Sequence, residues 1–315
     1  MIIREALAQG STDLKFAGIG TPGLDASLLL AHVLKTSRTA LIAAGTDTLS
    51  KKACIEYCKL IERRAAGECV AYIIEKKEFR GLDFFVNKSV LVPRPDTEIL
   101  VEVALKFVAP LAETQRRGER GEEKERGIII LDLCTGSGAV AISLKHEMQE
   151  LEVHATDISP EALEVAKTNA SKLLPNTQIH FYLGDLYNAQ LIPHSTFHIK
   201  HSSLHTKHST LNTKFNLIIS NPPYIPSDEI QTLSTEVQNE PRLALDGGVS
   251  GLEIINRIIE KAPEYLLQNG YLLLEADPCQ MDDISILLDK KGFNDIQLYK
   301  DLSGSQRVIG GRYEK

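Results

Sequence analysis

IIILDLCTGSGAVAISL, residues 128–144, contains a strand-like run, a glycine turn and a helix-like run in direct succession. The apolar run leads straight into Gly136 and Gly138, and the residues after them repeat apolar side chains with a helical period. Glycines between a strand and a helix allow the backbone to come close to a bound ligand. The stretch therefore predicts the first strand, ligand-binding turn and helix of a doubly wound α/β sheet.

Strand-like and helix-like segments continue to alternate beyond this stretch. Four further apolar runs are VHATD (153–157), IHFYLGDL (179–186), FNLIIS (215–220) and YLLLEA (271–276). Helical patterns lie between them, which is typical of a parallel sheet covered on both faces. Two closing runs, IQLYK (296–300) and RVIGG (307–311), have no helix between them. We therefore expect a seven-stranded Rossmann-like sheet that ends in an antiparallel hairpin.

The N-terminal quarter of the chain shows helical patterns only. GLDASLLLAHVLK (23–35) repeats apolar residues at intervals of three and four, and SKKACIEYCKLIERRAAG (50–67) opens on a Ser cap and closes on Gly. This pattern predicts a small all-helical domain over residues 1–75.

A linker and two inserts complete the expected organisation. Two short β-like runs around Gly81 and Asn87 predict a β-hairpin linker over 76–95. Asp96 or Thr97 can cap the next helix, so the sheet domain is expected over 96–315. Within that domain, we expect two flexible inserts, at 113–127, which is densely charged, and at 190–213, which is rich in His, Ser and Thr.

The composition is that of an ordinary globular protein, with 43% hydrophobic and 24% charged residues. Residues 1–92 carry 13 Lys and Arg against 10 Asp and Glu, whereas the remainder carries 22 against 32. Because enzymes that bind nucleic acid usually have a basic catalytic domain, we expect no stable nucleic-acid partner. The start MIIREALAQG lacks the pattern of a secretory signal, and no run reaches the ~18 apolar residues of a membrane span. We therefore expect a cytoplasmic protein without a membrane partner.

Cysteines and histidines do not form a convincing metal-binding pattern. Five cysteines without a C-x-x-C pair argue against a disulfide framework or a four-ligand zinc site, and Cys54 and Cys58 are expected to be buried thiols. The tract 190–214 holds five of the nine histidines, but no Cys or carboxylate accompanies them. We predict no metal site.

A nucleoside is the expected ligand of the glycine turn. Asp157 ends the run 153–157, where an acidic residue can accept hydrogen bonds from ribose hydroxyls. GSGAVA (136–141) also satisfies the G-x-G-x-x-A pattern of dinucleotide-binding proteins. These residues alone do not decide whether the ligand is a nicotinamide cofactor or another nucleoside.

LIISNPPYIP, residues 217–226, runs an apolar strand into Asn221, Pro222, Pro223 and Tyr224. Proline has no N–H, so this strand end offers acceptors and few donors. The side-chain oxygen of Asn221 and the backbone carbonyl of Pro222 can accept both N–H groups of a planar, conjugated NH2, whose nitrogen is otherwise a poor nucleophile. Tyr224 can stack on the flat group. This motif predicts methyl transfer to a conjugated nitrogen.

The glycine turn together with NPPYIP resembles the class I S-adenosylmethionine-dependent methyltransferases that act on conjugated nitrogens. Four further segments resemble the family of peptide chain release factor glutamine methyltransferases: the helical N-terminal domain, the linker with VLVPRPDTE (90–98), NEPRLALDGGVSGLEIINRII (239–259) and DLSGSQRVIGGR (301–312). The similarity covers nearly the whole chain except the two inserts. It implies methylation of the side-chain nitrogen of the glutamine in the Gly-Gly-Gln motif of release factors, which the N-terminal domain would grip.

The resemblance also implies a set of site residues. The methyl donor would be held by Cys134, Thr135, Gly136, Ser137 and Gly138 on its methionine and ribose side, by Asp157 at the ribose, by Asp185 and Leu186 at the adenine, and by Asn221. The substrate glutamine would be received by Asn221, Pro222, Pro223 and Tyr224. Arg94, Asp96 and Thr97 match the family's linker motif near the pocket without a defined role.

The chain departs from the family pattern at two places. Cys134 stands where a glycine is usual, and Ala276 and Asp277 stand where Ile-Gly is usual, so the loop after the fifth strand is expected to be shaped differently. Two other functions remain compatible with part of the sequence. A nucleic-acid adenine methyltransferase would use the same four residues at Asn221, and a nicotinamide oxidoreductase or a non-catalytic nucleotide-binding module would account for GSGAVA and Asp157 alone. The helical domain could also serve only to stabilise the protein.

Overall fold

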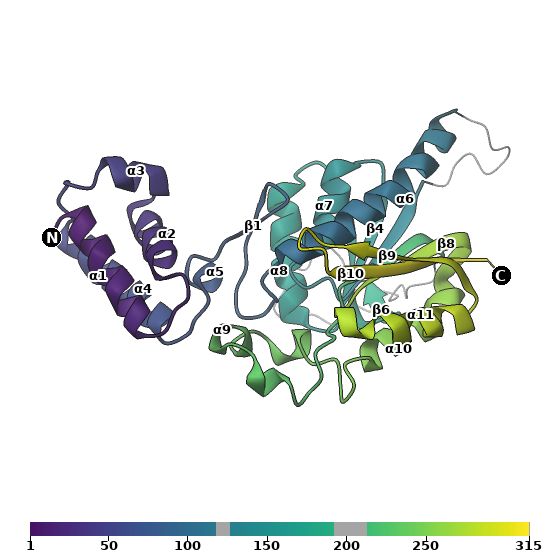
Figure 1. Cartoon of the computed structure of the whole chain (residues 1–315). Helices are drawn as coiled ribbons and strands as arrows, with labels where there is room; N and C mark the ends of the chain where they lie inside the picture. The colour runs from purple at the N-terminus through teal and green to yellow at the C-terminus, as the bar shows by residue number, and fades with distance from the viewer. Residues whose placement is uncertain (118–126, 192–212, 315) are drawn as a thin grey trace, which may run out of the picture. The chain divides into compact units, whose positions relative to one another are not determined.

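The computed structural model describes residues 1–117, 127–191 and 213–314 (Figure 1). Contacts within the chain separate two compact units. The first unit contains Met1–Lys76, Val86–Lys88 and Leu233–Glu240, and the second contains Lys77–Phe85, Ser89–Thr232 and Pro241–Lys315. The chain therefore returns to the first unit at 233–240, within the region that the sequence assigns to the sheet domain.

The first unit is helical, as the sequence predicts. Its helices are α1 (Ile3–Phe16), α2 (Pro22–Leu34), α3 (Arg38–Ala43), α4 (Lys51–Ala65), α5 (Val70–Ile73) and α9 (Thr235–Gln238). Helices α1, α2 and α4 pack together over a core that includes Leu14 and Leu29. Ser50 caps α4 by accepting a hydrogen bond from the Ala53 N–H at 3.1 Å. Cys58 is exposed, so the prediction of a buried thiol is wrong there, because its position on α4 faces outward.

An ion network centred on the buried Arg64 side chain connects three segments of the first unit. Arg64 Nε contacts Asp25 Oδ2 at 2.7 Å, and Arg64 Nη2 contacts Glu236 Oε2 on α9 at 2.8 Å. The side chains of Arg64 and Asp25 are only 5% and 6% exposed, and buried charges persist in proteins when they are paired. Asn239 Nδ2 also donates to the Gly67 carbonyl at 3.0 Å. These polar contacts hold the segment 233–240 on α2 and α4.

The second unit is built on an eight-stranded sheet with the order β6-β5-β4-β3-β7-β8-β10-β9. The strands are β3 (Ile129–Leu133), β4 (Glu152–Asp157), β5 (Ile179–Asp185), β6 (Asn188–Leu191), β7 (Phe215–Ser220), β8 (Leu266–Glu275), β9 (Phe293–Lys300) and β10 (Gln306–Tyr313). Strands β3, β4, β5, β7 and β8 are parallel, and β10 pairs antiparallel with both β8 and β9. All seven predicted strands and the terminal hairpin are confirmed.

The eighth strand, β6, was not predicted. It pairs antiparallel with the end of β5 and contains only four residues, which is too short for a periodic signal. Its presence places the start of the predicted insert 190–213 in the sheet, while 192–212 lies outside the described residues. In the other predicted insert, 113–127, the first five residues belong to helix α6 (Glu98–Arg117). Residues 118–126 lie outside the described residues.

Within the described parts of this unit, five helices flank the sheet, and they pack in two groups (Figure 1). In one group α6 packs beside α7 (Ala139–Glu147) and α7 beside α8 (Pro160–Leu173); in the other, α10 (Glu253–Tyr265) packs beside α11 (Met281–Lys290). The apolar core under α10 and α11 includes Leu131, Ile218 and Ile258, all fully buried. Short 3-10 turns occur at η1 (Pro95–Thr97), η3 (Ile230–Thr232), η4 (Arg242–Ala244) and η5 (Pro278–Gln280). In the part of the chain that the structure describes, every helix is too short or too polar to cross a bilayer.

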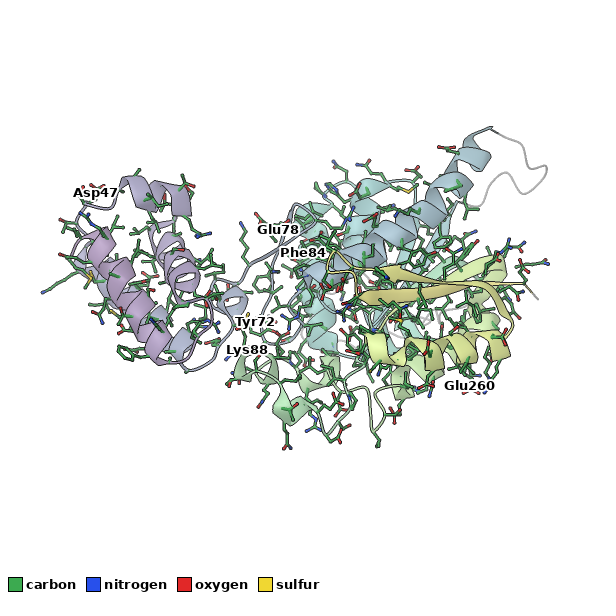
Figure 2. The ribbon with its side chains drawn as sticks, in the orientation of Figure 1. Asp47, Tyr72, Glu78, Phe84, Lys88 and Glu260 are labelled. Atoms are coloured by element: carbon green, nitrogen blue, oxygen red, sulfur yellow. The ribbon has the colours of Figure 1, made fainter. Side chains whose placement is uncertain are left out.

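A hairpin precedes the sheet, as the sequence predicts. Its strands are β1 (Lys77–Phe79) and β2 (Leu82–Phe84), and both turn residues, Arg80 and Gly81, have positive φ, which favours a tight two-residue turn. Phe79 and Phe84 are buried and meet edge to face, with ring centroids 6.1 Å apart. Phe84 is labelled in Figure 2. The second β-like run, around Asn87, is irregular backbone, because the hairpin turns at Gly81 and its register ends at Phe84.

Asn169 on α8 connects the hairpin to the glycine turn. Its side chain is fully buried, its Oδ1 accepts from the Phe85 N–H at 2.7 Å, and its Nδ2 donates to the carbonyls of Phe85 and Ser137, both at 2.9 Å. A single buried amide therefore satisfies three backbone groups from two loops.

Asn169→Ala is expected to lower the free energy of unfolding by about 2–3 kcal/mol, because it leaves these three backbone groups without partners. Urea denaturation followed by circular dichroism measures the change. Asn176→Ala, at an exposed asparagine just beyond α8, is the matched control and should stay within about 0.5 kcal/mol of the wild type. Equal stability of the two variants would show that the Asn169 bonds contribute nothing.

Candidate active site

A cavity of about 230 Å³ lies at the carboxyl ends of β3, β4, β5 and β7, all within the second unit. Ligands of open α/β sheets bind at this edge. The predicted site residues that line the cavity are Cys134, Thr135, Gly136, Ser137, Asp157, Asp185, Leu186, Asn221 and Pro223, together with Arg94 and Thr97. Gly138, Pro222 and Tyr224 are predicted site residues that lie outside this lining. The structure thus brings most of the predicted set to one place.

The two glycines of the turn after β3 serve different purposes. Both have positive φ, +55° at Gly136 and +81° at Gly138, which disfavours any residue with a Cβ. A Cβ at Gly138 would lie 2.8 Å from Ile142 Cδ1, so this glycine allows α7 to pack closely. A Cβ at Gly136 would have no heavy atom within 4 Å. The backbone at Gly136 is therefore accessible to a ligand, whereas Gly138 allows the turn and α7 to pack closely.

Asp157 ties this turn to the end of β4. Its Oδ2 accepts from the Gly136 N–H at 2.8 Å and its Oδ1 accepts from the Ser159 N–H at 2.9 Å. Burial raises the pKa of the Asp157 carboxyl, and these backbone N–H groups act in the opposite direction. An acceptor-only carboxylate on the cavity wall can bind the hydroxyls of a ribose.

Asp132, inside β3, is a lining residue that sequence reasoning missed. It is 1% exposed, and it accepts hydrogen bonds from Thr135 Oγ1 at 2.6 Å and from the Ala141 N–H at 3.3 Å. Burial raises the pKa of its carboxyl to about 7. The sequence signal that could have identified Asp132 is a carboxyl residue within an otherwise apolar strand. Its hydrogen bonds stabilise the glycine turn and the start of α7.

The end of β5 carries Asp185 and Leu186, as predicted. Asp185 Oδ2 forms an ion pair with Nη2 of Arg257, a cavity residue on α10 that sequence reasoning also missed. Both side chains are nearly half exposed, so the pair adds little stability. Its effect is to hold the Asp185 carboxylate at the rim.

Asn221 follows β7 and lines the cavity. Its Nδ2 donates to Thr97 Oγ1 at 3.1 Å. Pro222 is buried and Pro223 lines the cavity. Tyr224 is half-buried, its pKa is raised by burial, and its carbonyl accepts from Gln280 Nε2 at 2.9 Å. These contacts hold the four residues in a rigid arrangement in which the Asn221 carboxamide is bonded on its nitrogen side.

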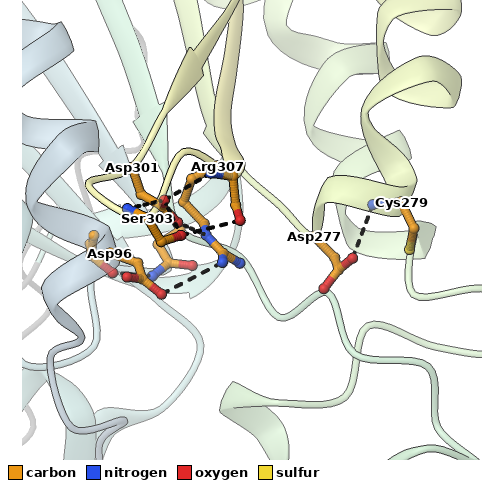
Figure 3. A network of polar contacts seen from close by, with 9 residues as sticks. Asp96, Asp277, Cys279, Asp301, Ser303 and Arg307 are labelled. Atoms are coloured by element: carbon orange, nitrogen blue, oxygen red, sulfur yellow. Dashed lines mark hydrogen bonds and ion pairs between the residues drawn. The ribbon is translucent and has the colours of Figure 1, made fainter.

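The linker motif contacts the closing hairpin of the sheet. Arg307 on β10 lies between two carboxylates, with Nη2 3.6 Å from Asp96 Oδ2 and Nε 3.3 Å from Asp301 Oδ2 (Figure 3). Asp301 also accepts from the Ser303 N–H at 2.9 Å, which closes the turn between β9 and β10. The segments around VPRPDTE and DLSGSQR, far apart in sequence, therefore meet beside Thr97.

The loop after β8 has its own local structure at the unusual Ala276 and Asp277. Asp277 Oδ1 accepts from the Cys279 N–H at 3.0 Å (Figure 3). The Asp277 N–H donates to Gln280 Oε1 at 3.2 Å. This capping box starts η5. Gln280 is thereby placed to donate to Tyr224, so the loop supports the Asn221–Tyr224 segment.

One group of potential metal ligands occurs among the described residues, formed by Glu152, His154 and His180. His154 is already bonded through both ring nitrogens, to Tyr182 Oη at 2.8 Å and to Glu152 Oε1 at 2.9 Å. This group lies on β4 and β5 outside the cavity lining, and the histidine tract at 190–214 falls almost entirely outside the described residues.

Family models and curated relatives match this chain in both its N-terminal and its C-terminal parts. The family model for the PrmC N-terminal domain matches residues 5–74, and that for a methyltransferase domain matches residues 130–236. The chain is 33% identical to the release factor glutamine methyltransferase of Clostridium acetobutylicum, over 98% of both chains. It is 36% identical to the enzyme of the same name from Vibrio cholerae, over 99% of this chain and 97% of the relative.

A solved structure with a similar fold is the hMettl16 catalytic domain in complex with an MAT2A 3'UTR hairpin. The similarity has a TM-score of 0.53 at 12% identity and covers 81% of this chain and 82% of that one. At this identity the likeness concerns the fold alone.

Proposed function

The chain belongs to the family of release factor glutamine methyltransferases, and we propose that it methylates the side-chain nitrogen of the glutamine in the Gly-Gly-Gln motif of peptide chain release factors. The observation that carries this proposal is that Asn221 lines the cavity while its carboxamide nitrogen is bonded to Thr97, another lining residue. Its oxygen is then available to a donor. The relatives confirm the family resemblance seen in the sequence, and they leave no support for a nicotinamide oxidoreductase.

The methyl donor is S-adenosylmethionine, which supplies an electrophilic methyl group on a sulfonium sulfur. The cavity suits this molecule because it combines an open backbone at Gly136 with carboxylates at Asp157 and Asp185. In the proposed arrangement, Cys134 to Ser137 hold the methionine and ribose side, Asp157 accepts from the ribose hydroxyls, and Asp185 and Leu186 border the adenine. Gly138 is proposed to act only through the shape of the turn.

The substrate is a primary carboxamide, whose nitrogen lone pair is delocalised and therefore weakly nucleophilic. We propose that Asn221 Oδ1 accepts one N–H of this group and that the Pro222 carbonyl accepts the other, which raises electron density on the nitrogen as it attacks. Tyr224 is proposed to stack on the flat amide. The nitrogen releases one proton once the new C–N bond has formed, so no strong base is required beforehand.

The first unit is proposed to recognise the release factor. Support comes from its match to the N-terminal domain of the same family and from the segment 233–240, which follows the Asn221–Tyr224 motif in sequence and is held to α2 and α4 through Arg64. Because release factors act in translation, the proposed place of action is the cytoplasm.

The central experiment incubates the purified protein with methyl-labelled donor and a release factor, either wild type or with the Gly-Gly-Gln glutamine replaced by alanine. We expect one methyl group on the wild-type factor, detected by intact mass, and none on the variant. Label on the variant would reject the assigned glutamine. A single-stranded oligonucleotide containing adenine serves as the control substrate, and its methylation in place of the factor would establish the nucleic-acid alternative instead.

A further inference from the structure

Glu275 is a buried carboxyl directly beside the Asn221 motif, and the mechanism above does not use it. It ends β8, and β7 and β8 pair in parallel with Ser220 opposite Leu274. Asn221 comes directly after Ser220 and Glu275 directly after Leu274, so the two stand side by side at the sheet edge. Glu275 is 1% exposed, and its Oε2 has no hydrogen-bond partner among the described residues. A buried, unpaired carboxylate oxygen in a native fold calls for a reason.

Thr97 provides the physical connection between the two. It is 4% exposed, and its Oγ1 accepts from Asn221 Nδ2. Both Thr97 and Asn221 interact with the Glu275 carboxyl and favour its charged form. A hydroxyl can either donate or accept, so Thr97 alone does not decide which end of the Asn221 amide it meets. An ionised carboxylate only accepts, so it draws the Thr97 proton and the Asn221 NH2 to its own side.

We propose that Glu275, together with Thr97, is a positioning residue that sets the orientation of the Asn221 carboxamide, with the NH2 turned inward and the oxygen turned to the substrate amide. This inference rests on the proposed function. With the amide reversed, Asn221 would present N–H groups to the NH2 of the glutamine, and two donors would face each other. The orientation therefore decides whether Asn221 can act as an acceptor.

The electrostatic surroundings of Glu275 make this orientation sensitive to pH. Burial raises the pKa of its carboxyl to about 7, while Thr97, Asn221 and the charge of Arg307 act downward and Asp96 acts upward. Tyr224 also faces it, and because burial raises the pKa of the Tyr224 hydroxyl, that group stays neutral through this range. Below pH 7 Glu275 becomes protonated and can donate, so the preference for one amide orientation weakens and turnover should fall.

Glu275→Gln tests the inference, since it keeps the shape and removes the acceptor-only character. We expect turnover to fall about tenfold, the effect of losing one correctly oriented hydrogen bond, with unchanged affinity for S-adenosylmethionine. The decline of turnover below pH 7 should be smaller than in the wild type, and the part that remains would come from other groups such as Asp132. Thr97→Val should show a similar loss and Thr97→Ser should restore most of it. The loss in the Thr97→Val and Glu275→Gln double variant should be less than additive, because both act through one contact.

Two measurements separate positioning from a structural role. The thermal midpoint of Glu275→Gln at pH 8 should equal or exceed that of the wild type, because a buried ionised carboxylate is costly. The NMR signals of the Asn221 side-chain NH2, recorded without donor or substrate, should titrate near the pKa of Glu275 in the wild type and not in Glu275→Gln. Glu264→Gln, on the exposed side of α10, is the control and should leave turnover, midpoint and titration as in the wild type.

The outcomes distinguish this inference from the proposed function. A wild-type protein that methylates release factors, combined with a Glu275→Gln variant that has the same turnover and the same pH profile, would overturn the inference alone. A lower midpoint with additive losses would assign Glu275 a structural role and also overturn it. If the Asn221 signals titrate as expected but no release factor is methylated, the orientation stands and the proposed function fails.

Discussion

Asn221→Ala is expected to lower turnover with a release factor by a factor of about 100 to 1,000, as removal of one preorganised group that stabilises a transition state does in other enzymes. The variant removes the oxygen proposed to accept the substrate N–H and leaves the β7 backbone intact. The affinity for S-adenosylmethionine should change little, because the turn after β3 and the Asp157 carboxylate are untouched. Single-turnover methylation measures the first quantity, and calorimetric titration with the donor measures the second.

The exposed Asn176→Ala is again the matched control and should keep wild-type turnover. Asn221→Asp is a second comparison, since it keeps acceptor oxygens but loses the N–H that Thr97 receives, and it would place a second carboxyl beside Glu275. We expect it to remain impaired. If Asn221→Ala turned over at a rate near that of the wild type, Asn221 could not be the proposed acceptor.

Sequence reasoning succeeded where the chemistry is local. The strand, glycine turn and helix at 128–144 follow from the apolar period and from the conformational freedom of Gly136. Asp157 is expected at the next strand end because an acidic residue there can accept hydrogen bonds from ribose hydroxyls. In the structure, Asp157 Oδ2 lies 2.8 Å from the Gly136 nitrogen. The sequence pattern had assigned these two residues to the ends of neighbouring strands. Parallel strand order then accounts for their meeting.

Apart from Asp132, whose partners are local, the residues that were missed depend on pairing between distant segments. Glu275 stands at the end of a predicted strand, but only the β7-β8 neighbourhood places it beside Asn221. Gln280 reaches Tyr224 through a loop whose capping box is not visible as a site motif. The ion pair of Arg64 and Glu236 joins residues 172 apart and brings a segment of the sheet region to the helical unit. None of these contacts has a periodic or compositional signature, so burial and topology were needed to find them.

Asp157→Ala is expected to weaken binding of S-adenosylmethionine about 100-fold or more. A charged acceptor on ribose hydroxyls contributes roughly 1.5–3 kcal/mol per hydrogen bond, and every 1.4 kcal/mol corresponds to a factor of ten in affinity. The loss has a second component, because the variant also releases the Gly136 N–H from the contact that holds the glycine turn. Calorimetric titration with the donor measures the change, and methylation at saturating donor should recover most of the wild-type turnover.

The recovery at saturating donor is what separates this variant from Asn221→Ala, since one group is proposed to hold the donor and the other to activate the substrate. Asp157→Asn gives an intermediate test. Its side-chain oxygen can still accept from one backbone N–H, but its NH2 faces the other partner as a donor, so we expect a smaller loss of affinity. Glu161→Ala, at an exposed position in the first turn of α8, is the control for charge near the site. Were Asp157→Ala to bind the donor as tightly as Glu161→Ala does, the carboxylate of Asp157 would only shape the turn, and the ribose would have to be held by backbone groups of residues 134–137.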